Sequence, residues 1–163
     1  MHDKPTAEHK WLEKLLGEWT FEHRGPGGPG EPEKVFGGGK ETFRSLNGMW
    51  FVGESTMPMP DEIGGEGQMV ITLGYDIAKK TYVGSWVGSM MSRMWTYEGT
   101  IDPTGRILTL ESEGPVFEDP SKTTLYRDII EFTATGDRLF RSTMQGPDGN
   151  WVTFMSATYK RMK

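Results

Sequence analysis

The chain has 163 residues with a formal net charge of −5 at pH 7, and it contains 22 Gly, 10 Pro and no Cys. This length fits one domain with a core large enough to fold without disulfides or a structural metal. The acidic balance argues against nucleic-acid binding, which needs a basic surface, and the lack of Cys excludes thiolate chemistry. No apolar run is long enough to span a membrane and residues 1–10 lack a hydrophobic signal core, so we expect a cytoplasmic, bacterial protein.

The first predicted element is a short amphipathic helix over about residues 6–16. Thr6 is a suitable N-cap, and Gly17 stands where a helix can end in the left-handed conformation. The apolar residues at helical spacing form one stripe, which consists of Trp11, Leu12, Leu15 and Leu16. Because a helix this short is marginal alone, the stripe must dock on the rest of the chain or, in a homodimer, on a second copy.

After Gly17 the apolar period changes from that of a helix to that of a strand, and residues 17–24 place Trp19, Phe21 and His23 on one face. Further strands are predicted at residues 40–46, 49–57, 68–75, 81–88, 94–101, 106–111, 123–133, 138–145 and 151–161. The Gly-rich residues 25–30 and 37–39 are predicted as loops. About 8–10 strands with short connections favour an antiparallel closed barrel over a sandwich, since closure leaves no exposed strand edges.

Aromatic and sulfur-containing side chains are unusually dense in residues 84–99. Such side chains form adaptable walls for apolar ligands, and ordinary core packing is the alternative interpretation. The predicted wall of a ligand pocket consists of Trp50, Trp86, Met90, Met91, Trp95 and Tyr97. In residues 124–132 we place the face with Tyr126 and Asp128 inside. These two residues and Glu98 are the predicted polar groups that orient the ligand.

Asp128 is the main candidate for chemistry, because a carboxylate inside a barrel needs a partner or a raised pKa. With a raised pKa, Asp128 can act as a general acid or base beside Tyr126, as in an isomerase, cyclase or dehydratase. The alternative is an ion pair with one of three arginines, Arg44, Arg93 or Arg127. The three His residues show no metal-binding spacing, so we expect no metal and no cofactor.

Motifs along the whole chain are shared with one bacterial family. They include EHKWLEKLLGEW, SLNGMWFVGE, LGYD, YVGSWVGSMM followed by WTYEGT, LTLESEGP, YRDIIEF and DGNWVTFMSATYKR. In combination they resemble the family catalogued as domain of unknown function 1579, over about residues 7–161. The resemblance implies a small lipocalin-type (calycin) barrel, and no general reaction is attached to the family.

The triplet Gly17-Glu18-Trp19 also resembles the Gly-x-Trp of the first strand in lipocalins and related barrels. In those proteins the Trp plugs the closed end and a basic residue of the last strand stacks over it, so Arg161 or Lys160 would be that partner here. One inward His is a haem ligand in the related nitrobindin-type barrels. The other features of those proteins are missing from this sequence, so we expect His23 to be a residue near the barrel rim.

The sequence therefore predicts an all-β, lipocalin-like antiparallel barrel in one domain over residues 1–163, with the helix at about 6–16 and the barrel at about 17–161. The predicted function is binding of a small hydrophobic molecule inside the barrel. A small acid–base enzyme that uses Asp128 and Tyr126 is the alternative, and a module that dimerises through the helix is a third interpretation.

Overall fold

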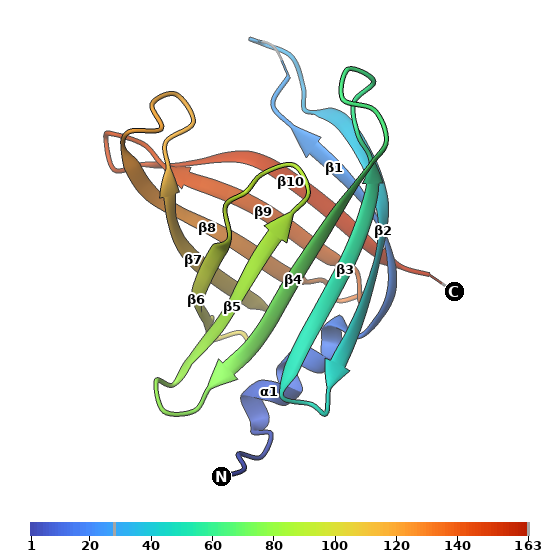
Figure 1. The fold of residues 1–163 in the computed structure, drawn as a ribbon, viewed down its shortest axis with the longest axis vertical. Helices are drawn as coiled ribbons and strands as arrows, with labels where there is room; N and C mark the ends of the chain where they lie inside the picture. Colours follow the sequence, from blue (N-terminus) through green and yellow to red (C-terminus); the bar gives the residue numbers. More distant parts are fainter. Residues whose placement is uncertain (28, 163) are drawn as a thin grey trace.

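The computed structural model describes residues 1–27 and 29–162, and in this part of the chain ten antiparallel strands close into a barrel (Figure 1). A helix, α1 (Ala7–Leu12), continues into the short 3-10 turn η1 (Glu13–Leu15) before the first strand. The strands are β1 (Gly17–Gly25), β2 (Lys34–Leu46), β3 (Trp50–Pro58), β4 (Glu66–Asp76), β5 (Thr81–Gly88), β6 (Trp95–Ile101), β7 (Ile107–Pro115), β8 (Thr123–Phe132), β9 (Arg138–Gln145) and β10 (Trp151–Arg161). The predicted fold class, an all-β antiparallel barrel with one N-terminal helix, is confirmed.

Each strand pairs with its neighbours in the sequence, and β1 pairs with β10 to close the sheet. This up-and-down order needs only short turns. Turn residues in the sequence therefore mark the ends of the strands, which is why the predicted strand positions agree with the structure. Within the described residues no helix is long and apolar enough to cross a membrane.

Residues 37–39 belong to β2, so the prediction of a loop there is wrong. Their lack of side chains is what allows the strand to form. A Cβ atom at Gly39 would overlap the carbonyl oxygen of Thr56, and one at Gly38 would overlap that of Phe21. Glycine in a strand often marks such a close approach of two backbones.

The helix closes one end of the barrel. The backbone N–H of Thr6 donates to Nδ1 of His9 at 3.0 Å, which caps the helix, and Trp11 Nε1 donates to the carbonyl oxygen of Gly105 at 2.6 Å. Leu12 and Leu15 have no exposed surface. The apolar stripe therefore docks on the barrel of its own chain, with Trp11 and Leu16 partly buried against the same core.

Trp19 lies fully buried at this closed end between two guanidinium groups. The guanidinium carbon of Arg161 is 4.2 Å from the centre of the Trp19 ring, and that of Arg138 is 4.6 Å from it. Arg161 also donates to the carbonyl oxygens of Leu16 at 2.7 Å and Lys14 at 2.6 Å, at the end of the helical segment. The basic partner of Trp19 in the last strand is thus Arg161 and not Lys160, and Arg138 is a second partner.

Candidate functional site: the barrel cavity

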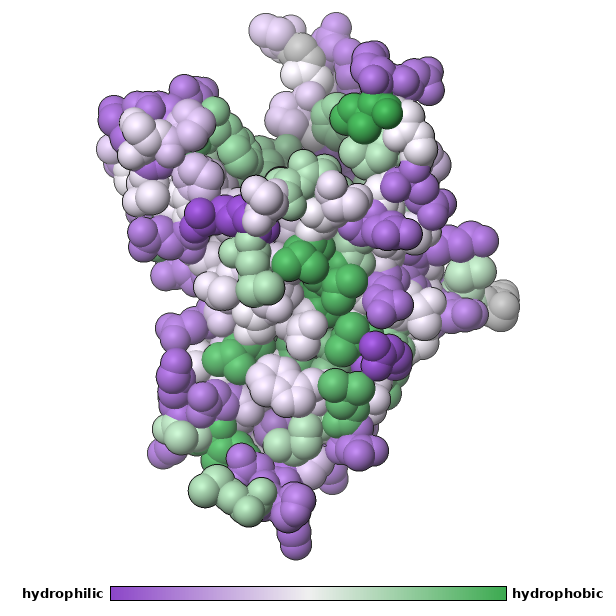
Figure 2. Space-filling model, viewed as in Figure 1, coloured by the Kyte–Doolittle hydropathy of each residue, from purple (hydrophilic) through white to green (hydrophobic). Residues whose placement is uncertain are grey.

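A cavity of about 270 Å³ lies inside the barrel above this closed end. Its lining comes from inward-facing residues of all ten strands, and from Met91 and Phe117 in the loops at the end away from α1. Figure 2 shows the molecule hollowed between the loops at that end, with hydrophobic surface in the hollow. The cavity is therefore approached through these loops.

The outer half of the cavity has aromatic walls. The ring of Tyr126 packs edge-to-face on Trp95 at 4.9 Å between ring centres, and Phe117 lies 5.3 Å from Phe154 in the same geometry. The Tyr126 hydroxyl donates to the carbonyl oxygen of Pro115. Because that hydroxyl is engaged by the backbone, Tyr126 contributes apolar surface here, and it is not the hydroxyl partner of Asp128.

Asp128 lies deeper, on β8, where it is partly buried and lines the cavity. Its Oδ2 accepts a 2.5 Å hydrogen bond from the Tyr97 hydroxyl, and its Oδ1 accepts a 2.7 Å bond from Ser142 Oγ. Burial raises the pKa of Asp128, and these two hydrogen bonds lower it in part. The strand register brings Ser142 next to Asp128, because the two residues are direct partners in the β8–β9 ladder.

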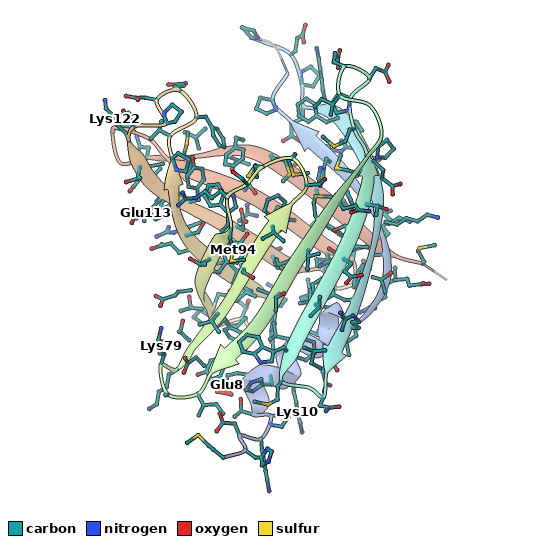
Figure 3. The ribbon with its side chains drawn as sticks, in the orientation of Figure 1. Glu8, Lys10, Lys79, Met94, Glu113 and Lys122 are labelled. Carbon is teal, nitrogen blue, oxygen red and sulfur yellow. The ribbon has the colours of Figure 1, made fainter. Side chains whose placement is uncertain are left out.

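The predicted alternative of an ion pair for Asp128 is wrong. Each candidate arginine is engaged elsewhere: Arg44 with Glu54 at 3.7 Å, Arg127 with Glu111 at 3.1 Å, and Arg93 with the carbonyl oxygen of Glu113 at 2.9 Å (Glu113 is labelled in Figure 3). In strands the side chains alternate between faces, so Arg44 on β2 and Arg127 on β8, each next in sequence to an inward residue, point outward, whereas Arg93 lies in the loop between β5 and β6.

The floor of the cavity holds a buried ion pair between Arg138 and Glu41, with exposed fractions of 3% and 5%. The guanidinium carbon of Arg138 also lies 4.0 Å from the centre of the Tyr159 ring. Burial raises the pKa of Glu41, and the attraction and hydrogen bond of Arg138 oppose this shift. The floor is thus polar, while the outer walls are aromatic.

His23 lies on the inner face of β1 and lines the cavity beside Phe21, with 4.9 Å between the ring centres. Burial lowers the pKa of His23. The side chain is therefore a neutral imidazole in a partly buried position at neutral pH. It lies in the half of β1 that leads away from α1.

The structure brings together most of the residues that the sequence singled out. Those that line the cavity are Trp86, Met91, Trp95, Tyr97, Tyr126 and Asp128. Trp50 lies on the outer face of β3 over Gly74 and is 42% exposed. Glu98 points to solvent, with Oε1 3.8 Å from Nζ of Lys79 in the turn near α1 (Figure 3). Met90 lies in the loop after β5, 39% exposed. These three predicted positions in the pocket are therefore wrong.

Sequence reasoning missed the residues of the floor and part of the polar wall. They are Glu41, Arg138, Ser142 and Tyr159. Alternation along β9 gave a signal, since Arg138, Phe140 and Ser142 share the inward face. The pairing of Glu41 with Arg138 spans 97 positions of sequence, and no local pattern reveals it.

Fold and site together define a small closed-barrel protein with an internal cavity open between loops at one end. The chain belongs to the family described as protein of unknown function (DUF1579), whose profile matches residues 4–161. Among solved structures it is similar to Rv2717c from M. tuberculosis, with a TM-score of 0.62 and 13% sequence identity, over 98% of this chain and 100% of that chain. At this identity the likeness shows the fold alone. No curated protein matches the chain.

Proposed function

We propose that the protein binds a small, mostly apolar molecule in the cavity of a lipocalin-like barrel. The observation that carries this proposal is the cavity itself, about 270 Å³ with aromatic outer walls. Protein interiors are close-packed, with few voids larger than a water molecule, so a space of this size favours a guest. It lies just below the range of roughly 300–1,000 Å³ typical of ligand pockets, which suits a small molecule of one to three rings.

The distribution of polarity supports one orientation of the ligand. Trp86, Trp95 and Phe117 offer apolar surface in the outer part, while Asp128 and Ser142 lie on the polar wall. An apolar ligand with one polar end therefore enters polar end first, so that its apolar part remains between the aromatic walls.

The test is the binding of a neutral fluorescent probe, N-phenyl-naphthylamine, whose emission rises in apolar surroundings. We expect saturable binding that a Trp86→Ala substitution weakens by about tenfold, because a fully buried aromatic contact contributes roughly 1.5–3 kcal/mol. Trp50→Ala is the matched control, since Trp50 lies on the outer face, and it should leave the affinity within about twofold.

Two results would contradict the proposal. One is a lack of saturable binding by the folded wild-type protein. The other is an equal loss of affinity in both variants, which would place the probe outside the cavity or show only a general loss of structure. Circular dichroism on each variant separates that second cause from a specific effect.

A second candidate function, acid–base catalysis, is favoured by the state of Asp128. Its pKa is raised by burial, and its hydroxyl partner is Tyr97 rather than the predicted Tyr126. A raised pKa brings a carboxyl group closer to the pH at which it can both take up and release a proton. If a bound ligand is turned over, Asp128→Asn should abolish turnover even at ligand concentrations that saturate the variant. The cytoplasmic location and the homodimer stay predictions from the sequence.

A further inference from the structure

We infer that the polar end of the bound molecule is a cation, a hydrophobic amine or another organic ammonium group, held by the carboxylate of Asp128. This inference rests on the proposed binding function, since it names the chemical class that the same cavity selects. It follows from the hydrogen bonds of Asp128, from the charges that line the cavity, and from the aromatic walls.

The first step concerns Asp128 itself. Both carboxylate oxygens accept hydrogen bonds from hydroxyl groups, those of Tyr97 and Ser142, as an ionised carboxylate does. Each oxygen keeps a second lone pair for a further donor. Both partners are neutral, and among the described residues no Lys, Arg or His nitrogen lies within 4.0 Å of the Asp128 oxygens. A buried carboxylate is normally paired with a cation, and here the protein supplies none.

The second step is the sum of charges around the cavity. Glu41 and Arg138 form an ion pair, so together they contribute no net charge. His23 is neutral at neutral pH because burial lowers its pKa. The charge of Asp128 is therefore left uncompensated. A ligand carboxylate would place a second negative charge in the same poorly solvated space, whereas an ammonium group would neutralise the first.

The third step concerns the walls. The faces of aromatic rings carry partial negative charge and attract ammonium groups at distances within about 6 Å. The rings that line the cavity include Trp86, Trp95, Tyr97, Phe140, Phe154 and Tyr159. The guanidinium carbon of Arg138 already lies 4.0 Å from the centre of the Tyr159 ring. One cation–π contact is therefore present among the residues that line the cavity. A cation gains from these faces, while a neutral alcohol of the same shape gains less.

The experiment compares three molecules with one skeleton, phenethylamine, phenethyl alcohol and phenylacetate, by calorimetric titration at neutral pH. The first is an ammonium ion, the second is neutral and the third is an anion. We expect the amine to bind at least about tenfold more tightly than the alcohol, because a hydrogen bond to a charged group is stronger than a neutral one. Phenylacetate should bind most weakly.

Two substitutions locate the effect. Asp128→Asn should reduce the affinity for phenethylamine to that for phenethyl alcohol and leave the alcohol's affinity nearly unchanged. Glu98→Gln is the matched control. It also removes one carboxylate, but Glu98, which follows Tyr97 on β6, points to solvent and not into the cavity. It should leave the preference for the amine intact. The comparison of the three ligands on the wild-type protein needs no variant, so it decides the inference even if Asp128→Asn does not fold.

The outcomes separate this inference from the proposed function. If the alcohol binds as tightly as the amine, or the acid binds more tightly, the charge assignment is overturned and the binding function stands. If the amine is preferred equally by wild type and by folded Asp128→Asn, the cation site lies elsewhere and the inference also fails. If none of the three ligands binds at millimolar concentration and N-phenyl-naphthylamine does not bind either, both proposals are overturned.

Discussion

The hydroxyl of Tyr97 donates a 2.5 Å hydrogen bond to Asp128 across the inside of the barrel, over a sequence separation of 31 residues. The two residues belong to β6 and β8, and β7 lies between them in the sheet. A side chain as long as Tyr is needed to reach over that strand. Asp128 is consequently held by its neighbours in a fixed orientation before any ligand arrives.

Replacement of Tyr97 by Phe should raise the pKa of Asp128 above its wild-type value. The hydrogen bond from Tyr97 stabilises the carboxylate form, and its loss leaves the effect of burial less opposed. Tyr126→Phe is the control, since the Tyr126 hydroxyl donates to Pro115 and not to Asp128. Carbon-detected NMR titration of the Asp128 carboxyl group, assigned with Asp128→Asn, measures both. A shift in Tyr126→Phe but not in Tyr97→Phe would contradict the arrangement seen here.

The titration of Asp128 should also change the free energy of unfolding with pH. Because its pKa is raised in the folded state, the folded protein binds this proton more tightly than the unfolded chain. The free energy of unfolding then falls as the pH rises from the ordinary pKa of 3.8 through the raised value. Asp128→Asn lacks this proton, so its stability relative to wild type should increase with pH across that window.

Urea unfolding of both proteins over a pH series provides the measurement. The raised pKa of Glu41 has the same sign of effect and the lowered pKa of His23 the opposite sign, and both are present in the two proteins. Their contributions therefore cancel in the difference. A difference that stays constant with pH would show that Asp128 titrates alike in the folded and unfolded states.

The sequence predicted the strands of this barrel because the signals are local. Alternation and turn residues lie within a few positions of each other, so they specify a strand without knowledge of its partners. The same rule explains a failure in the site. Tyr97 and Glu98 are adjacent in one strand, and alternation allows only one of them to face the cavity. The prediction placed both in the pocket, and Trp50 is likewise an outer-face residue, next to the fully buried Phe51.

The polar floor was beyond prediction for a different reason. Glu41 and Arg138 occupy β2 and β9, which are not paired with each other in the sheet. Their contact depends on the closure of the barrel and on which strands face each other across it. The choice of Tyr126 rather than Tyr97 as the partner of Asp128 failed in the same way, since proximity in sequence was mistaken for proximity in space.

The buried pair on the floor should be more sensitive to single substitutions than to a double one. Glu41→Leu leaves the Arg138 guanidinium buried without its counter-charge and should cost about 3–5 kcal/mol of stability. The double variant Glu41→Leu with Arg138→Met removes both charges and should be less destabilised than Glu41→Leu alone. Urea unfolding of the two singles and the double gives the coupling energy. Single costs that simply add would show that the two side chains do not stabilise each other.

The closed end of the barrel depends on Arg161. Its guanidinium packs on Trp19 and donates two hydrogen bonds to the carbonyls of Leu16 and Lys14, so one side chain joins the last strand to the helix and the first strand. Arg161→Ala should therefore lower the free energy of unfolding by about 1.5–3 kcal/mol, from the lost charged hydrogen bonds and cation–π contact.

Two further variants separate charge from geometry at this end. Lys160→Ala removes a neighbouring exposed positive charge and should change stability by less than about 0.5 kcal/mol. Arg161→Lys keeps the charge, but an ammonium group cannot bridge two carbonyls and cover a ring in the same planar geometry, so most of the loss should persist. If Arg161→Lys is as stable as wild type, charge alone holds the closed end, and the planar contact with Trp19 contributes nothing measurable.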